Sequence, residues 1–317
     1  MRMRYLIAIA ALLMVGAATD VRGTTPILKA AQTDFEIAYL DVRSNRVTNF
    51  ATVTAGTPFD VRVVSGPSGR YRAVVDDKML DELSAGKWRW IAPSKPNHYR
   101  LAIVGPGQAE LTVNIAVEVP AAKIRNGRLN GYRIGNYPAR PLRGLSIYNR
   151  PEGFIEVMPE HLVLQVSPRF QLAQFLCKQE SNFPKYLLLR PRLLLKLEYL
   201  LDRLNEAGYP ISNFHVMSGY RTPAYNAHIG NGRYSRHTWG GAADIFVDQN
   251  PRDGVMDDLN NDGHIDKADA HWLAKFIESL AEREDYKPFI GGLSPYGSTA
   301  SHGPFVHIDV RGSHARW

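Results

Sequence analysis

The sequence predicts an N-terminal all-β sandwich, immunoglobulin-like in type, followed by a C-terminal α+β domain with a small antiparallel sheet. In the first half, short apolar or alternating runs recur between turn-rich pieces, as they do in antiparallel sandwiches. In the second half, an apolar stripe at helical spacing precedes strand-like segments that carry polar side chains. A length of 317 residues suits two domains better than one.

The first 23 residues are typical of a secretory signal peptide. Arg2 and Arg4 supply the positive start, residues 5–18 form a short apolar run, and small residues at 16–18 suit cleavage. An uncleaved anchor is the alternative, but the run is shorter than the ~18–20 residues that span a bilayer. We therefore expect a periplasmic or secreted protein with no stable membrane insertion after signal cleavage.

Composition and charge indicate a globular protein that favours anionic partners. Hydrophobic residues make up 44% of the chain and charged residues 22%, and the net charge is +7. Wall polymers, membrane faces and nucleic acid are all anionic, but no strong basic cluster is interleaved with aromatic residues and the N-terminus indicates export, so we do not expect nucleic acid as the partner. Cys177 is the single cysteine, which excludes an intramolecular disulfide and favours a buried structural thiol over a catalytic one.

Residues 24–121 are predicted to form the sandwich. The strand-like runs are FEIAYLDV from Phe35, FDVRVV from Phe59, YRAVV from Tyr71, WRWIA from Trp88, YRLAIV from Tyr99 and LTVNIAVEV from Leu111. They carry no catalytic pattern, so we expect a structural or wall-docking module. Residues 122–152 are rich in Arg, Gly, Asn and Pro and are predicted to be a surface linker.

Residues 153–317 are predicted to form the α+β domain. Leucines recur at helical spacing between Leu187 and Ala207, which predicts a helix that packs on the core, and Gly208 is a typical stop. A strand is expected around residues 214–218, before the segments that carry the candidate site residues.

One of these segments places two polar side chains on the same face of a strand. Val306, Ile308 and Val310 alternate with His307 and Asp309, so the apolar chains share one face and the polar chains share the other. A second segment presents Asp244 in the same way, opposite its apolar neighbours.

Three residues in these segments predict a metal site. The run Gly-Gly-Ala-Ala at 240–243 lets the backbone pass close to its neighbours, so that His237 folds back beside Asp244. Two imidazoles and one carboxylate, from His237, Asp244 and His307, make a zinc site with an open fourth position. Non-haem iron oxygenases use the same ligand types, commonly with closer spacing, and a purely structural group is the other alternative.

The order of these motifs resembles the D-Ala-D-Ala carboxypeptidase family of zinc peptidases, which shares its metal site with hedgehog signalling domains and bacterial murein endopeptidases. The motifs are Ser-Gly-Tyr-Arg from Ser218, Ser-x-His-x6-Asp from Ser235 and His-x-Asp from His307. The resemblance covers about residues 151–317. It implies that the same three residues bind zinc and that the reaction is hydrolysis of peptide bonds in peptidoglycan.

The resemblance also implies roles for residues around the metal. Arg221 matches the family arginine that holds the substrate carbonyl or carboxylate. Pro304 stands where many relatives place an acidic base, whereas His302 matches the base of some family carboxypeptidases. Asp309 is the rival, either as a base or as the partner of a ligand histidine. Candidate substrate-binding residues are Ser235 and Tyr220, with loop capping and packing as alternatives.

An insertion at 253–270 contains the pattern of a twelve-position calcium loop, similar to the loops of dockerin modules. Gly263 stands at position 6, and Ile265 at position 8 is expected to pack inward. We expect a structural calcium ion here, with a solvated acidic turn as the alternative. The candidate ligands are Asp258, Asn260, Asp262, His264, Asp266 and Asp269.

Together these patterns predict a zinc metallopeptidase that acts on peptidoglycan peptides, as a D,D- or L,D-type carboxypeptidase or an endopeptidase. The main alternative is a non-catalytic peptidoglycan-binding protein with the same fold, against which the open metal position argues. A peptidase of ordinary proteins is a further alternative, because the wall substrate rests on the family resemblance alone.

Overall fold

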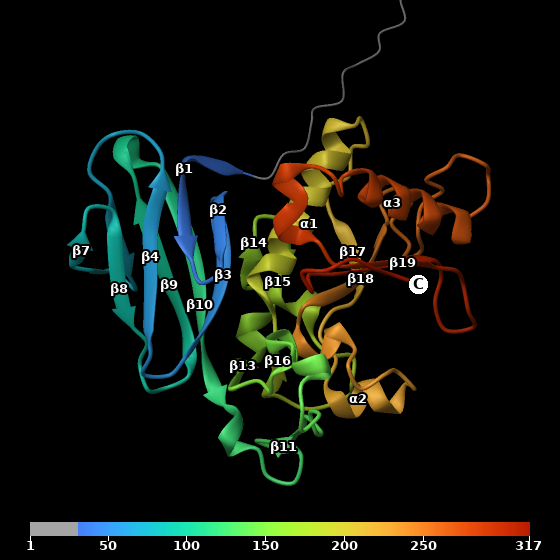
Figure 1. The fold of residues 1–317 in the computed structure, drawn as a ribbon, viewed down its shortest axis with the longest axis horizontal. Coiled ribbons are helices and arrows are strands. Elements are labelled where there is room, and N and C mark those ends of the chain that lie inside the picture. The colour runs from blue at the N-terminus through green and yellow to red at the C-terminus, as the bar shows by residue number, and fades with distance from the viewer. Residues whose placement is uncertain (1–30) are drawn as a thin grey trace, which may run out of the picture.

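The computed structural model describes residues 31–317, so the predicted signal peptide at 1–23 lies outside the described residues. Figure 1 shows a β-rich N-terminal lobe beside a mixed α/β lobe that holds the C-terminal half of the chain. In residues 31–317, no helix combines the length and the apolar character needed to cross a bilayer.

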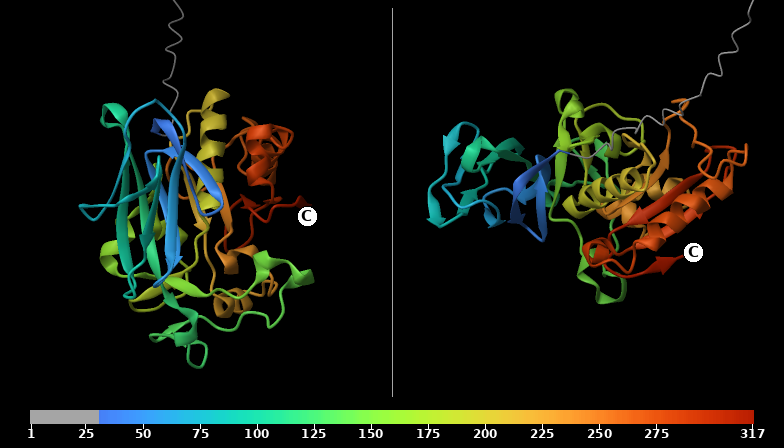
Figure 2. Two further views of the ribbon diagram at one scale, coloured as in Figure 1. Left: turned by 60° about the vertical axis from the view of Figure 1, so that its left-hand side comes forward. Right: turned by 90° about the horizontal axis from the view of Figure 1, so that it is seen from above.

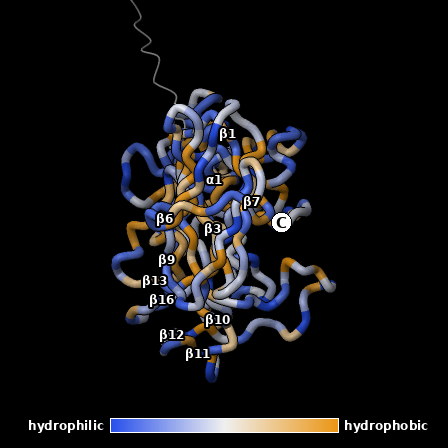
Figure 3. Tube along the Cα trace, turned by 90° about the vertical axis from the view of Figure 1, so that its left-hand side faces the viewer, coloured by the Kyte–Doolittle hydropathy of each residue, from blue (hydrophilic) through white to orange (hydrophobic). Residues whose placement is uncertain are grey.

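The first sheet of the N-terminal lobe follows the predicted alternation of apolar and polar residues. In β1 the side chains of Phe35, Ile37 and Tyr39 are buried while their neighbours are not, and Trp88 of β8 joins the same core. Figure 3 shows hydrophilic and hydrophobic residues interspersed along the strands of this lobe. The order is β2-β1-β4-β8-β7, with bounds β1 Gln32–Tyr39, β2 Val42–Arg46, β4 Pro58–Ser65, β7 Glu82–Ser84 and β8 Lys87–Ile91.

The second sheet continues from the N-terminal lobe into the C-terminal half. The last residues of β10 pair with β13, as in Val119 opposite Phe154, so the sheet crosses the predicted domain boundary. All its pairs are antiparallel except β3 with β10, which is parallel. The path is β16-β13-β10-β9-β5-β6, with β3 also paired to β10; the bounds are β3 Thr48–Thr54, β5 Arg72–Val75, β6 Lys78–Met79, β9 Asn97–Val104, β10 Glu110–Pro120, β13 Gly153–Val157 and β16 Lys185–Leu187.

The segment 122–152 does more than link the two lobes. It forms a hairpin of β11 (Arg128–Leu129) and β12 (Tyr132–Arg133), and the side chains of Leu129, Tyr132 and Ile134 are buried in the core of the C-terminal lobe. Its Arg, Gly and Pro content favoured a loop, but these closely spaced apolar residues anchor it.

The predicted helix forms as α1 (Pro191–Glu206) and lies between the two lobes (Figures 1 and 2). It begins four residues later than Leu187 because residues 185–187 form β16 and Pro191 suits the first helical turn. Most of its leucines pack in the C-terminal core, while Leu195 joins the N-terminal core. The short 3-10 helices are η1 Pro106–Gln108, η2 Ala121–Lys123, η3 Leu142–Gly144, η4 Ser146–Tyr148, η5 Pro159–Val163, η6 Leu172–Phe175, η7 Arg236–Trp239 and η8 Glu284–Phe289.

A small sheet at the far side of the C-terminal lobe carries the candidate site, as predicted for an α+β domain. Helix α3 packs against its strands β19 and β20. Its order is β17-β18-β20-β19-β21, antiparallel except for β19 with β21. The remaining bounds are β14 Gln165–Ser167, β15 Phe170–Gln171, β17 Phe214–Ser218, α2 Pro223–His228, β18 Ala242–Val247, α3 Lys267–Ser279, β19 Gly292–Tyr296, β20 Phe305–Asp309 and β21 Ala315–Arg316.

Candidate metal centre

The pairing of β18 with β20 places Asp244 directly opposite His307. His237 arrives from η7, which ends at Gly240 in the left-handed conformation with φ of 64°. A Cβ at Gly240 would lie 2.3 Å from the carbonyl of Leu188, so only glycine allows the chain to turn here into β18. The close backbone approach predicted for this glycine-rich run is confirmed.

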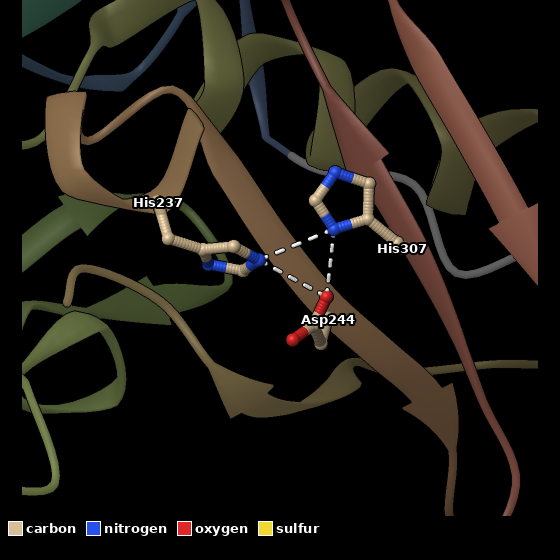
Figure 4. Close-up of side chains that lie close together, drawn as sticks. All are labelled: His237, Asp244 and His307. Atoms are coloured by element: carbon tan, nitrogen blue, oxygen red, sulfur yellow. Dashed lines mark hydrogen bonds and ion pairs between the residues drawn. The ribbon is translucent and has the colours of Figure 1, made fainter. Parts of the chain in front are cut away.

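Three potential ligand atoms converge from these elements (Figure 4). Nε2 of His237 lies 3.1 Å from Oδ1 of Asp244 and 3.2 Å from Nδ1 of His307, and the last two atoms are 2.8 Å apart. Atoms bound to one tetrahedral zinc at about 2.0–2.1 Å lie about 3.3 Å apart. The group therefore fits a zinc ion, and it is the one group of its kind within residues 31–317.

Neighbouring groups fix which nitrogen of each imidazole faces the site. Nδ1 of His237 lies 2.6 Å from the carbonyl of Gly219, so it must carry a proton and Nε2 keeps its lone pair for a metal. Nε2 of His307 lies 3.4 Å from Oδ2 of Asp309, which turns Nδ1 toward Asp244. Such outer contacts orient metal-ligating histidines.

Electrostatics favour the ionisation state that a metal requires at Asp244 and His237, whereas at His307 burial opposes the charge but Asp244 and Asp309 raise the pKa of the ring. Burial opposes the charge of Asp244, but the imidazoles of His237 and His307 hold the pKa of its carboxyl well below the ordinary value. Burial likewise lowers the pKa of His237, despite the attraction of Asp244. A carboxylate and a neutral imidazole therefore face the site near neutral pH.

Asp309 is surrounded by donors and does not open onto the cavity beside the metal group. Its side chain is fully buried and accepts hydrogen bonds from the backbone N–H of Gly292 at 2.8 Å and from Nε of Arg311 at 2.8 Å. Burial opposes its charge, but His307 and Arg311 hold the pKa of Asp309 far below its ordinary value. This arrangement fits the outer-partner role that the sequence left open.

Arg221 lies beside the metal group, as the motif implied. Its Nε donates to Oγ of Ser218 at 2.8 Å, and its Nη2 forms an ion pair with Oδ2 of Asp244, the oxygen that does not face the histidines. Its side chain retains 12% of its exposed area, on the wall of a cavity of about 1200 Å³. The guanidinium can therefore reach a molecule bound next to the metal.

The other candidate residues separate into two groups. His302 and Ser235 line the same cavity, and Nδ1 of His302 donates to the carbonyl of Gly303 at 2.8 Å, which leaves Nε2 able to accept a proton. Tyr220 does not line it: the side chain is 1% exposed and its hydroxyl lies 3.1 Å from that of Tyr137. Its assignment to substrate binding is therefore corrected to core packing.

Trp317 is a wall of the cavity that the sequence analysis missed. Its ring centroid lies 5.2 Å from that of His307, and the guanidinium of Arg311 stands over it at 5.3 Å. The position depends on the pairing of β21 with β19, a long-range contact that no local pattern encodes.

The predicted calcium loop uses its oxygen atoms for backbone hydrogen bonds. Asp266 and Asp269 form a capping box at the start of α3, and Asp269 also accepts from the N–H of Leu259 at 2.8 Å. Ile265, expected to pack inward, is 46% exposed, which corrects that expectation. Hydrogen bonds within the loop also engage Asp258, Asn260, Asp262 and His264. Calcium binding stays a prediction.

A buried His-Asp-His group that opens on a cavity defines a class of metal site, in which protein atoms fill three positions and leave one open. Residues 168–267 match the family model described as Peptidase M15, and the chain therefore carries a Peptidase M15 domain. The matched stretch holds Arg221, His237 and Asp244, whereas His302 and His307 lie beyond it. The domain supports a metallopeptidase, and the buried group is consistent with zinc.

The other comparisons do not identify a fold for the N-terminal half. No curated protein matches this chain. Among solved structures, the crystal structure of the titin M3 domain matches with 11% identity over 27% of this chain and 99% of that chain. The TM-score of 0.18 is too low to support an argument, so the immunoglobulin-like type stays a prediction.

Proposed function

We propose that this protein is an exported zinc metallopeptidase that hydrolyses amide bonds in peptidoglycan peptides. The observation that carries the proposal is the convergence of Nε2 of His237, Oδ1 of Asp244 and Nδ1 of His307 beside a large cavity. The Peptidase M15 domain supports peptide hydrolysis, and the basic composition suits an anionic wall polymer.

The residues around the group can share the work of amide hydrolysis. Zinc, when bound, acts as a Lewis acid and brings the pKa of a coordinated water to about 7. Arg221 can donate to the carbonyl oxygen of the substrate as negative charge develops there. His302 can accept a proton at Nε2 and return it to the departing amine. Asp309 holds His307 in the orientation that presents Nδ1.

The proposal is tested by incubating the purified full chain with muropeptides and following the products by mass spectrometry. We expect new products that disappear with a chelator, reappear with added zinc and are absent for His237→Ala. The matched control is His271→Ala, because His271 is exposed on α3. An unchanged muropeptide profile together with retained binding would favour the non-catalytic alternative.

The substrate class has its own discriminating measurement. Peptides that contain only L-residues are offered beside muropeptides under the same conditions. We expect cleavage of the muropeptides alone, and efficient cleavage of the L-peptides would favour a peptidase of ordinary proteins. The export signal is checked by fractionating cells that express the full chain and a variant that lacks residues 1–23.

A further inference from the structure

A second cavity, of about 660 Å³, adjoins the one beside the metal group. It lies between the β11–β12 hairpin, the segment 178–184 and helix α2. The two cavities share Lys178 and Tyr225 as lining residues, so they adjoin at these two side chains. None of the residues assigned to the metal or to proton transfer lines the second cavity.

Hydrogen bonds tie the walls of this second cavity to the element that carries Arg221. Nε2 of Gln179 donates to the carbonyl of Arg133 at 3.0 Å, and Oε1 of Gln179 accepts from Oγ1 of Thr222 at 3.2 Å. Thr222 is the N-cap of α2 and follows Arg221 directly. The N–H of Ala224 also donates to the carbonyl of Ile134 at 3.0 Å.

The hairpin is held close to α2 at a single glycine. A Cβ on Gly135 would lie 2.6 Å from the backbone nitrogen of Ala224, and the φ of Gly135 is 84°. The cavity therefore has fixed walls and a defined position relative to the candidate active site.

The charge of the second cavity is mainly positive. Arg128, Arg133 and Lys178 line it and are exposed, whereas Glu180 is the single carboxylate among the lining residues. None of these three cations forms an ion pair with another residue of the 31–317 part of the chain. Arg233 adds a further positive charge on the wall of the first cavity.

We propose that the second cavity is a subsite for a carboxylate-bearing stretch of the peptide substrate. This proposal rests on the proposed peptidase function and specifies its substrate as an extended anionic peptide rather than a free dipeptide. Exposed cations that have no ion-pair partner attract and orient carboxylates, and no existing ion pair has to be broken first.

The length of α2 gives a scale for the separation between Arg221 and the far wall of the second cavity. The helix has six residues and is therefore about 9 Å long, with Arg221 just before its start and His228 of the second cavity at its end. An extended peptide covers at most about 3.3–3.6 Å per residue, so about three residues of substrate span the length of α2, and we place the carboxylate at that spacing in the test peptide.

The test measures binding, so it does not depend on turnover. A fluorescent hexapeptide with glutamates about three residues from its central amide is titrated onto chelator-treated full-length protein. The comparison peptide carries glutamine in place of glutamate. We expect the double variant Arg133→Gln/Lys178→Gln to raise the Kd of the glutamate peptide about tenfold and that of the glutamine peptide less than about twofold.

Two further variants keep the result interpretable. Arg133→Lys retains the charge and should bind the glutamate peptide within about threefold of the parent. Arg62→Gln removes an exposed cation from β4 of the N-terminal lobe and should leave both Kd values unchanged. Equal weakening of both peptides, or no weakening of either, would overturn the subsite. Charge-selective binding without any hydrolysis by the zinc-loaded protein would instead count against the proposed function alone.

Discussion

Asp309 contacts the candidate metal ligand His307 and determines how that ligand is oriented. Its carboxylate contacts Nε2 of His307 and is held in turn by Arg311 and the N–H of Gly292. The chain of contacts fixes the ring of His307 with Nδ1 toward Asp244. We therefore assign Asp309 a positioning role and leave His302 as the candidate base.

Replacing Asp309 by asparagine should weaken zinc binding while leaving the fold intact. Loss of the charged partner of His307 is expected to reduce zinc affinity about 10- to 100-fold. Competition with a chromophoric chelator measures this change. Asp60→Asn, which alters an exposed ion pair with Arg89 in the N-terminal lobe, is the control. Unchanged affinity with a lost catalytic rate would instead indicate that Asp309 transfers protons.

Arg221 should be irreplaceable by lysine. Its guanidinium bonds to Ser218 and Asp244 together, and a single ammonium on a flexible stem lacks that fork of donors. We expect Arg221→Lys to reduce kcat/KM on muropeptides about 10²- to 10³-fold with one zinc per chain retained. Arg89→Lys serves as the control. A variant that keeps full activity would remove Arg221 from the mechanism.

Sequence reasoning reached the metal residues because their spacing and alternation are local. His307 and Asp309 share a strand face, and glycines surround the turn between His237 and Asp244. Tyr220 was misassigned because a motif position says nothing about which way a side chain points: it turns into the core to meet Tyr137. Trp317 was missed because only the pairing of distant strands brings it to the cavity.

The acidic residues at the start of α3 can be explained either as helix caps or as ligands of a calcium ion. The side chain of Asp266 caps the helix by accepting from the N–H of Ala268 at 2.6 Å, and Asp269 completes the capping box. A capping box and positions 9 and 12 of a calcium loop use the same residue types at the same spacing. Sequence alone therefore could not separate them.

Added calcium separates the two explanations. If the loop binds calcium as predicted, a concentration one hundred times the Kd adds about 2.7 kcal/mol to the free energy of unfolding. The measurement is a thermal melt with and without calcium, with magnesium as the comparison. Asp258→Asn should abolish the increase in Tm. An unchanged Tm in calcium would show that these carboxylates serve only as caps and turns.

Other elements followed their patterns to within a few residues. The leucine stripe predicted α1, and its start moved to Pro191 because a proline suits the first helical turn and restricts the residue before it. The segment 122–152 differed more from its prediction as a surface linker. Its buried residues, such as Leu129 and Ile134, follow no helical or strand repeat, because their spacing depends on the surface against which they pack.

Across the whole molecule, the two lobes meet through charged side chains as well as apolar ones. Arg46 of β2 pairs with Asp202 of α1 at 2.6 Å, and Arg169 joins Asp202 at 2.7 Å and Glu198 at 3.2 Å. These side chains retain at most 10% of their exposed area. Such a buried network makes independent motion of the lobes costly, because separation would strand charges.

A histidine at this junction predicts an acid-sensitive fold. His98 of β9 lies with Nε2 at 2.9 Å from the carbonyl of Glu156, and burial lowers its pKa from 6.5 to about 4. Between these values the unfolded chain binds more protons than the folded one, so stability falls as pH falls from 6.5 to 4.

Thermal melts across this pH range test the prediction. His98→Gln keeps a donor for Glu156 but cannot ionise, so its Tm should depend less on pH than that of the parent. His271→Gln changes an exposed histidine on α3 and should leave the parent's pH dependence intact. Parallel curves for parent and His98→Gln would exclude His98 as the source.

Strand β10 has a consequence for anyone who wishes to rebuild this protein. Because β10 is hydrogen-bonded to β3 and β9 and then to β13, cutting between residues 120 and 122 would leave β13 paired with β16 alone. The C-terminal lobe therefore cannot be moved into another protein by cutting at that boundary. A fusion to another protein should be joined ahead of Gln32, where β1 begins, so that both sheets stay whole.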